Sequence, residues 1–300
     1  MASDRSRALR AIGLKLASVV LFVAMHSFIK ATADHIPPGE AVFFRSAFAI
    51  PVILAWVAVS GQLALGLWPM HPIGHFWRGL MGTVSMGLGF AGLAYLPLPE
   101  VTAIGFAAPL LTVIFAAIFL DERVPKLNWI AVLLGLCGVC IVLYPRLTIL
   151  DRAAADYSEL FGVFMILGCA VFAALAQTVV RKLLVTDRTP IIVLWFLITA
   201  TVLSLVTIPF GWVVPSGRDL VFLIASGLTG AVGQILMTES YRYAGASTVS
   251  PLDYFSLLLA LLIGYFVFGE APGEWLLFGA PLIVLAGVAV ALGTDRKGPD

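Results

Sequence analysis

The chain has 300 residues, of which 61% are hydrophobic and only 12% are charged, and its mean hydropathy is +1.03. Soluble domains carry about 25% charged residues, so this composition excludes an ordinary soluble globular protein and predicts an integral membrane protein. The net charge of +1 gives no indication of a nucleic-acid partner, and we expect none.

The first apolar segment follows the short basic stretch MASDRSRALR and has no cleavage-site pattern, so we expect a retained membrane helix rather than a signal peptide. A helix needs roughly 20 mostly apolar residues to cross the hydrocarbon core. Ten such segments follow one another, at residues 11–33, 38–60, 75–96, 98–120, 127–145, 159–183, 190–211, 218–242, 246–268 and 274–293. Their apolar runs are continuous, without apolar–polar alternation, which favours helices over barrel strands.

The charges near the span ends predict the orientation of these helices. With the N-terminus inside, most lysines and arginines fall on the cytoplasmic side, in accordance with the positive-inside rule. The outer side receives Lys30, Arg146, Arg152 and Arg218. We therefore expect both termini in the cytoplasm and a multi-pass protein of the bacterial inner membrane.

Two stretches of the sequence resemble each other at a fixed offset. IFAAIFLDERVP (114–125) ends in an acidic turn, and so does IGYFVFGEAP (263–272). The same offset aligns two glycines, a tyrosine and a glutamate of the first half with residues of identical type in the second, and these pairs are Gly79–Gly227, Gly82–Gly230, Tyr95–Tyr243 and Glu122–Glu270. Each half then holds five spans. Because five is odd, the second half must enter the membrane upside down, which is the plan of many secondary transporters.

This repeat predicts an all-α membrane protein built from two inverted five-helix units. We expect the first unit at residues 11–145, an extracytoplasmic linker at 146–158, the second unit at 159–293 and a cytoplasmic tail at 294–300. The glycines aligned between the halves are expected to let helices approach closely.

The ten spans, the acidic turns FLDE and FGE, and the pattern in FFRSAFAIP resemble the EamA family of the drug/metabolite transporter superfamily. The resemblance covers nearly the whole chain. It implies transport of a small molecule without nucleotide hydrolysis, and the sequence lacks a G-x-x-x-x-G-K-[ST] loop. Because members of the family export amino acids, including aromatic ones, we expect an exporter of amino acids. A purine, vitamin or drug-like solute is the alternative.

Charged side chains at membrane depth are costly and need a partner or a cavity. Arg45 lies about a third of the way into the second span and can bind a substrate carboxylate as a fork, or it can reach outward and pair with Glu40. Glu239 can bind a substrate ammonium group or carry a proton, or it can pair with Arg242 or Arg78.

Asp253 is a second acidic candidate for the same roles. Pro251 precedes it by two residues, and proline removes a helical hydrogen bond beside the acid. Broken helices with a polar residue at the break recur in transporter sites. We therefore expect Asp253 to bind substrate, with Tyr254 and Ser256 as its lining.

Further polar residues are candidates for a central cavity. His26 and Gln177 occupy equivalent positions in the two halves, so they either face each other across the pseudo-twofold or hydrogen-bond to neighbouring helices. Gln234 and Thr238 lie one turn apart and can share the cavity wall. Trp195 and Phe44 can stack on an aromatic substrate.

Other conspicuous residues are assigned structural roles. Glu122 and Glu270 each occupy a turn, where a carboxylate accepts hydrogen bonds from the N–H groups of the following helix. His71 and His75 have the spacing of metal ligands on a helix, but Pro72 and Gly74 lie between them, so we expect a loop and no metal. We expect no cofactor, a monomer in the bilayer, and neither an intramembrane enzyme nor a channel, because no nucleophile–base motif occurs and the halves are inverted repeats.

Overall fold

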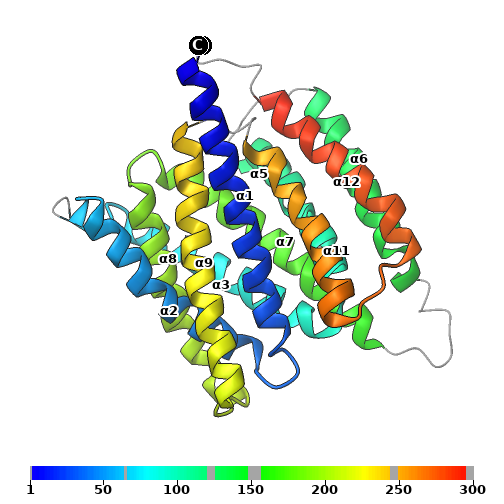
Figure 1. The fold of residues 1–300 in the computed structure, drawn as a ribbon, viewed down its shortest axis with the longest axis horizontal. Coiled ribbons are helices and arrows are strands. Elements are labelled where there is room, and N and C mark those ends of the chain that lie inside the picture. Colours follow the sequence, from blue (N-terminus) through cyan, green and yellow to red (C-terminus); the bar gives the residue numbers. More distant parts are fainter. Residues whose placement is uncertain (1, 64–65, 120–125, 148–156, 244–248, 295–300) are drawn as a thin grey trace.

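The computed structural model describes residues 2–63, 66–119, 126–147, 157–243 and 249–294, and the chain is helical throughout these ranges apart from its turns (Figure 1). The helices of the first repeat are α1 (Ala2–Lys30), α2 (Pro38–Val59), α3 (Pro72–Tyr95), α4 (Leu98–Gly105), α5 (Ala107–Phe119) and α6 (Lys126–Leu147). Those of the second are α7 (Tyr157–Leu183), α8 (Thr189–Ser204), η3 (Leu205–Phe210), α9 (Gly217–Tyr243), η4 (Ser250–Tyr254), α11 (Phe255–Phe268) and α12 (Glu274–Thr294).

The described helices make ten membrane crossings, as the sequence predicts. Six helical stretches are long and apolar enough to span a bilayer, counting α4 and α5 as one, and three shorter apolar stretches lie within α6, η4–α11 and α12. The tenth crossing is α3, which has 24 residues. At a rise of about 1.5 Å per residue this helix is also long enough to cross.

Prolines set the starts of several helices. α2, α3, α4 and α8 each carry proline in the first two helical positions, where the missing N–H costs nothing. The expected loop around Pro72 is therefore wrong, because this proline opens α3 and places His75 inside the helix. His75 is buried and pairs with Asp187, with Nε2 and Oδ2 3.2 Å apart.

The packing of the helices follows an inverted pseudo-twofold symmetry. α1 packs extensively on α9, and its equivalent α7 packs in the same way on α3. α2 contacts α8, its own equivalent, and α6 contacts α12. In Figure 1, α6 and α12 lie together at one edge of the bundle, and α2, α8 and α9 lie at the other. The pseudo-axis therefore passes between α2 and α8 at one edge of the bundle and between α6 and α12 at the other.

The fourth span of each repeat is broken at equivalent residues. α4 ends and α5 begins around Phe106, three residues before Pro109, which has no N–H to donate to the carbonyl of Gly105 and whose ring clashes with that carbonyl. η4 gives way to α11 at Tyr254, which the offset of the repeat aligns with Phe106. The two rings contact each other, with centroids 4.6 Å apart. The breaks therefore meet on the pseudo-axis.

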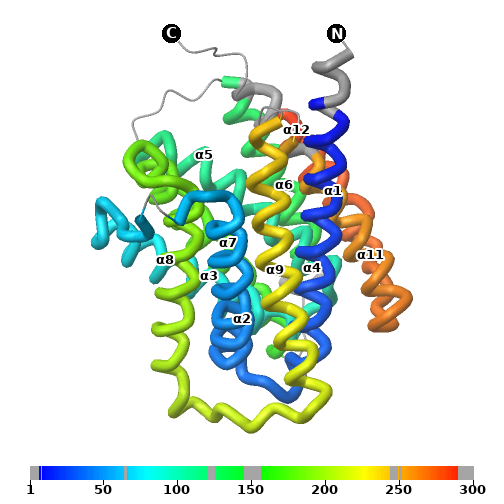
Figure 2. The backbone as a smooth tube through the Cα atoms, turned by 60° about the vertical axis from the view of Figure 1, so that its left-hand side comes forward, coloured from blue at the N-terminus to red at the C-terminus, as the bar shows by residue number. Residues whose placement is uncertain are grey.

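The start of α1 and the end of α12 lie at the same end of the bundle, and the connection from α8 to α9 lies at the opposite end (Figure 2). We name these ends the cytoplasmic and the outer side, following the positive-inside orientation. A buried apolar cluster fills the outer half and joins helices of both repeats: Ile29, Ile36, Ala41, Val42, Phe90, Leu93, Leu98, Ala200, Leu223 and Ala260. We call it the outer cluster.

Candidate functional site

A small cavity lies where the two repeats meet. Helices α2, α3, α8 and α9 enclose it, and these are two pairs related by the pseudo-twofold. Its volume is about 50 Å³, and its lining consists of Arg45, Ala49, Ile53, Arg78, Val193, Phe196, Leu197, Gly230, Ala231 and Gln234. Ligand pockets usually measure about 300–1,000 Å³. This central cavity therefore has room for one chemical group, not for a whole metabolite.

Arg45 provides one of the two charges of the central cavity. Its side chain leaves α2 in the outer half of the membrane and is only 7% exposed. Nε lies 3.5 Å from the sulfur of Met25, a weak acceptor, and Nη1 is buried without a hydrogen-bond partner. Gly230 makes room for this side chain, because a Cβ there would lie 3.3 Å from Nε.

Arg78 provides the second charge, from the cytoplasmic half of α3. Its guanidinium lies 4.2 Å above the ring of Phe196, and Nε and Nη1 are buried without a hydrogen-bond partner. The side chain folds over Gly82, one turn further along α3, where a Cβ would collide with Nη1. The charges of Arg45 and Arg78 are near enough to interact with each other. Two cations thus approach the midplane from opposite sides.

Three of the predicted polar residues lie around this region. Gln234 lines the cavity itself. His26 bonds to the backbone of Phe22 and lies within electrostatic reach of Arg45. Thr238 donates its hydroxyl hydrogen to the carbonyl of Gln234 at 2.8 Å, so it can only accept a hydrogen bond from a ligand.

The residues at the break of the ninth span form a separate group on the cytoplasmic side. Asp253 Oδ1 lies 2.8 Å from Nζ of Lys15, whose side chain is fully buried in α1. Tyr254 stacks on Phe106, and Ser256 is half-buried in the first turn of α11. The chain is indeed broken beside Asp253, as the proline predicts, but the acid is engaged by a lysine.

The other predicted ligands lie away from the central cavity. Phe44 stacks on Phe48 and packs against the outer cluster. Trp195 donates Nε1–H to the carbonyl of Leu67 at 2.8 Å and faces a shallow apolar hollow of about 460 Å³ near α2. Gln177 is exposed on α7, unlike the half-buried His26 with which it was paired.

Glu239 makes the ion pair that the sequence offered as its structural alternative. Its carboxylate lies 2.9 Å from Nη1 of Arg242, whose side chain is 69% exposed. For Arg45, the structural alternative of a pair with Glu40 is absent, and Glu40 instead accepts a hydrogen bond from the backbone N–H of Val213 at 3.0 Å. The roles of Glu239 and Arg45 as substrate ligands stay predictions.

A largely buried lysine–glutamate pair joins the two repeats on the outer side. Nζ of Lys30, at the end of α1, lies 2.8 Å from Oε1 of Glu270, and it also donates to the carbonyls of Leu93 and Leu96. Oε2 of Glu270 accepts the N–H of Leu98, the first residue of α4. The expected cap is therefore real but belongs to a helix of the other repeat, not to the following helix. We call this group the outer lock.

The equivalent acid Glu122 lies outside the described residues, so its expected cap stays a prediction. Within the described part of the chain, His, Cys, Asp and Glu do not gather in any group of three that can hold a metal ion.

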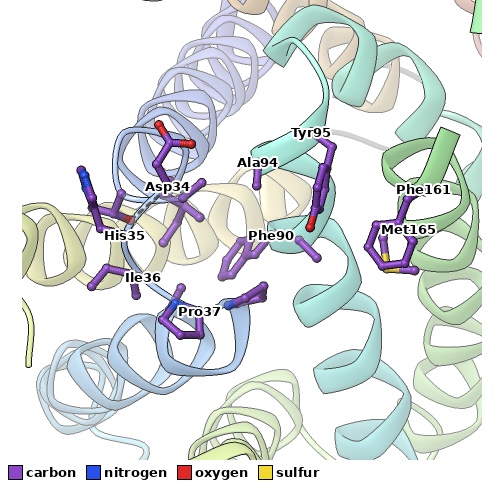
Figure 3. Close-up of a pocket in the computed structure, with 15 residues that line it drawn as sticks. Asp34, His35, Ile36, Pro37, Phe90, Ala94, Tyr95, Phe161 and Met165 are labelled. Carbon is purple, nitrogen blue, oxygen red and sulfur yellow. Dashed lines mark hydrogen bonds between the residues drawn. The ribbon is translucent and has the colours of Figure 1, made fainter. Parts of the chain in front are cut away.

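A larger pocket of about 430 Å³ opens on the outer side (Figure 3). The α1–α2 connection, with Asp34, His35 and Pro37, forms one wall, and Phe90 and Tyr95 of α3 form another. Asp34 and His35 are exposed at its rim, and the rest of the lining is mainly apolar. Four members of the outer cluster, Ile29, Ile36, Ala41 and Phe90, form part of the lining of this pocket.

On the cytoplasmic side, a buried acid joins the repeats. Asp187, in the α7–α8 connection, accepts the N–H of Met70 at 2.9 Å and pairs with His75. Burial by itself raises the pKa of this carboxyl, but the hydrogen bonds from Met70, His75 and Thr186 outweigh it and hold the pKa below its usual value. Asp187 is therefore a carboxylate at neutral pH.

Sequence reasoning missed Arg78, Lys15 and Phe106 as members of these groups. Arg78 was counted as an interfacial charge because it lies near a span end, but a glycine one turn further along is a signal that its side chain can lie along the helix. Phe106 was recoverable from the repeat, since the offset aligns it with Tyr254. Nothing in the sequence indicated that Lys15 and Asp253 meet.

Comparison with known proteins gives consistent results. The EamA-like transporter family matches residues 9–144 and 160–292. The chain is 31% identical over 288 residues to the pseudopaline exporter of Pseudomonas aeruginosa, covering 92% of this chain and 93% of that protein. It is 27% identical to an S-adenosylmethionine uptake transporter of Rickettsia felis (93% and 91% covered) and 28% identical to a riboflavin transporter of Rhizobium johnstonii (87% and 83% covered).

One solved crystal structure superimposes with a TM-score of 0.64 at 22% identity, covering 96% of this chain and 99% of the other. At this level of identity the match supports the fold alone.

Proposed function

The chain belongs to the EamA-like transporter family, and on that premise we propose that it moves a small metabolite across the bacterial inner membrane by alternating access. It is a secondary transporter and not an enzyme. Export is the favoured direction. The central cavity between α2, α3, α8 and α9 is the proposed binding place, with Arg45, His26 and Gln234 as candidate ligands.

The meeting of the two helix breaks is the observation that carries this proposal. Phe106 and Tyr254 occupy equivalent positions in the repeats and contact each other on the pseudo-axis. Helix breaks near the midplane of inverted repeats are typical of secondary transporters. Rocking of one repeat against the other around this contact would open each side of the central cavity in turn.

The outer lock indicates which side is closed. It joins the end of α1 to α4 and to the turn after α11, and the outer cluster seals the space beneath it. When Lys30 and Glu270 separate, water can hydrate both charged groups and offset the loss of the ion pair. Opening the outer lock therefore costs about a few kcal/mol and does not require unfolding. We therefore infer a conformation that is closed to the outside.

The substrate class that we propose differs from the one first expected. The relatives are named for pseudopaline, S-adenosylmethionine and riboflavin. These names favour the alternative of another metabolite class over an amino acid. We propose that the substrate is a small polar metabolite of this general kind.

The proposal is tested with purified protein in proteoliposomes. Labelled riboflavin, S-adenosylmethionine and a panel of amino acids and organic acids are offered with and without a pH gradient. We expect saturable uptake of at least one compound and counterflow when the same compound is preloaded. Flux without saturation or counterflow would indicate a channel and contradict alternating access.

A further inference from the structure

Within the part of the chain that the structure describes, the two arginines of the central cavity have no negative partner. Arg45 is only 7% exposed, and its Nη1 makes no hydrogen bond. Arg78 has two such atoms, Nε and Nη1. Within the described residues, neither side chain forms an ion pair with a carboxylate. Buried charges in proteins are normally paired and hydrogen-bonded, so this arrangement is incomplete as it stands.

The acids of the surrounding helices are already engaged elsewhere. Glu40 bonds to the backbone of Val213, Asp253 pairs with Lys15, and Glu239 pairs with Arg242. None of these is a free counter-charge that a small rotation would deliver to the cavity. The missing negative charge must then come from outside the described chain.

We propose that Arg45 and Arg78 form a binding site for a carboxylate group of the transported metabolite; this rests on the proposed function and specifies its substrate class. An arginine presents a planar fork of N–H donors that matches a carboxylate, and two forks around one anion satisfy donors that are now buried without acceptors. Phe196 holds the plane of the Arg78 guanidinium by a cation–π contact, which prepares the fork before binding.

The size and lining of the cavity fit this group. About 50 Å³ admits a carboxylate but excludes the body of a metabolite, which would extend along the wall formed by Gln234 toward His26. The amide of Gln234 offers both a donor and an acceptor to a polar substituent beside the carboxylate. Gly230 and Gly82 keep the space beside each arginine open. The substrate class is therefore a small organic acid with a polar substituent.

Binding can be measured without transport. Purified protein in detergent is melted with matched pairs of compounds that differ only in the anionic group, such as succinate and succinamide or phenylalanine and phenylalaninamide, with chloride and inorganic phosphate as further probes. The variants are Arg45→Gln and Arg78→Gln. The control is Arg218→Gln, since Arg218 also lies over a phenylalanine, Phe222, but is exposed at the outer end of α9.

We expect at least one carboxylate to raise the melting temperature and its amide not to do so. Each cavity variant should weaken that binding by about 30-fold, the lower range for removing one partner of a buried charge pair, and the Arg218→Gln protein should bind like the wild type. Without ligand, the two cavity variants should melt no lower than the wild type, because an unpaired buried charge is removed. A purely structural arginine would instead lower the melting temperature.

Three results would overturn the inference: equal binding of acids and amides, stabilisation by chloride or phosphate alone, or carboxylate binding that survives both cavity substitutions. The same variants in proteoliposomes separate this inference from the proposed function. Saturable flux of a neutral compound, unchanged in both variants, refutes the carboxylate site and leaves transport intact. Arginine-dependent binding without any flux upholds the site and refutes transport.

Discussion

Replacing Glu270 by glutamine should open the outer side. The side chains of Lys30 and Glu270 are only 11% and 15% exposed and lie 2.8 Å apart. Removing one partner of a buried pair costs about 3–5 kcal/mol. Glutamine keeps one acceptor oxygen, which can serve either Lys30 or the N–H of Leu98 but not both in the present geometry, so we expect a smaller loss of about 2 kcal/mol. If the lock exists only in the closed state, that loss shifts the equilibrium toward the open state by about 30-fold.

The shift is measured by the labelling of a cysteine beneath the lock. The native cysteines Cys137, Cys140 and Cys169 are first replaced by serine. Ala260, a fully buried member of the outer cluster, is then changed to cysteine, and cells are treated with a membrane-impermeant maleimide. A second variant, Val214→Cys, provides the reference for complete labelling from outside, because Val214 is 96% exposed in the α8–α9 connection.

We expect slow labelling at position 260 with the native lock and much faster labelling with Glu270→Gln. Asp187→Asn is the matched control, because it breaks a buried pair on the cytoplasmic side and should not expose position 260 to the outside. Exchanging the two charges of the lock should fail to restore closure, since a glutamate at position 30 cannot donate to the carbonyls of Leu93 and Leu96. Unchanged labelling in Glu270→Gln, or equal acceleration in the control, would refute the closing role.

Three further predictions concern other contacts of the bundle. The lowered pKa of Asp187 stabilises the fold above the usual carboxyl pKa, and this stability is lost as the pH falls through the lowered value, so Asp187→Asn should flatten the acid side of a plot of melting temperature against pH. Phe106→Ala should cost about 2–3 kcal/mol in the free energy of unfolding, whereas Tyr254→Phe, which keeps the ring contact, should be nearly neutral by thermal melting. Asp253→Asn leaves the buried Lys15 uncompensated and should lower the melting temperature, and adding Lys15→Met should restore it; a double variant less stable than the single one would contradict this account.

The sequence predicts the fold through its repeat. The offset that aligns Gly82 with Gly230 also aligns Phe106 with Tyr254, and in the structure these two residues mark the breaks of equivalent spans and contact each other. Proline explains the first break locally, since Pro109 lies inside the first turn of α5; in the second repeat a proline opens η4, three residues before the change to α11. Hydropathy, periodicity and the repeat therefore suffice for the number of spans and for their inverted arrangement.

The partners of the charged residues could not be predicted in the same way. Glu270 caps α4 rather than the following helix, and Lys15 reaches Asp253 across the bundle, because both contacts join residues far apart in the sequence. Local rules such as capping identify a carboxylate that accepts hydrogen bonds but not the helix that donates them. Only the rotation of each helix about its axis, which the tertiary packing sets, decides these pairs.

The positions of the charges along the membrane normal support a single mechanism. Lys30 is neutralised by Glu270 on the outer side, and Lys15 is neutralised by Asp253 on the cytoplasmic side. Between them, Arg45 and Arg78 remain without a carboxylate at the place where the repeats meet. Lys15 and Lys30 are thus paired near the two ends of the bundle, whereas the two central arginines form no ion pair within the described residues. Their positive charge is therefore available to an anion that binds and dissociates. An anionic substrate would neutralise the two arginines only while bound, and its departure would restore the repulsion between Arg45 of α2 and Arg78 of α3, which lie on neighbouring helices of the first repeat.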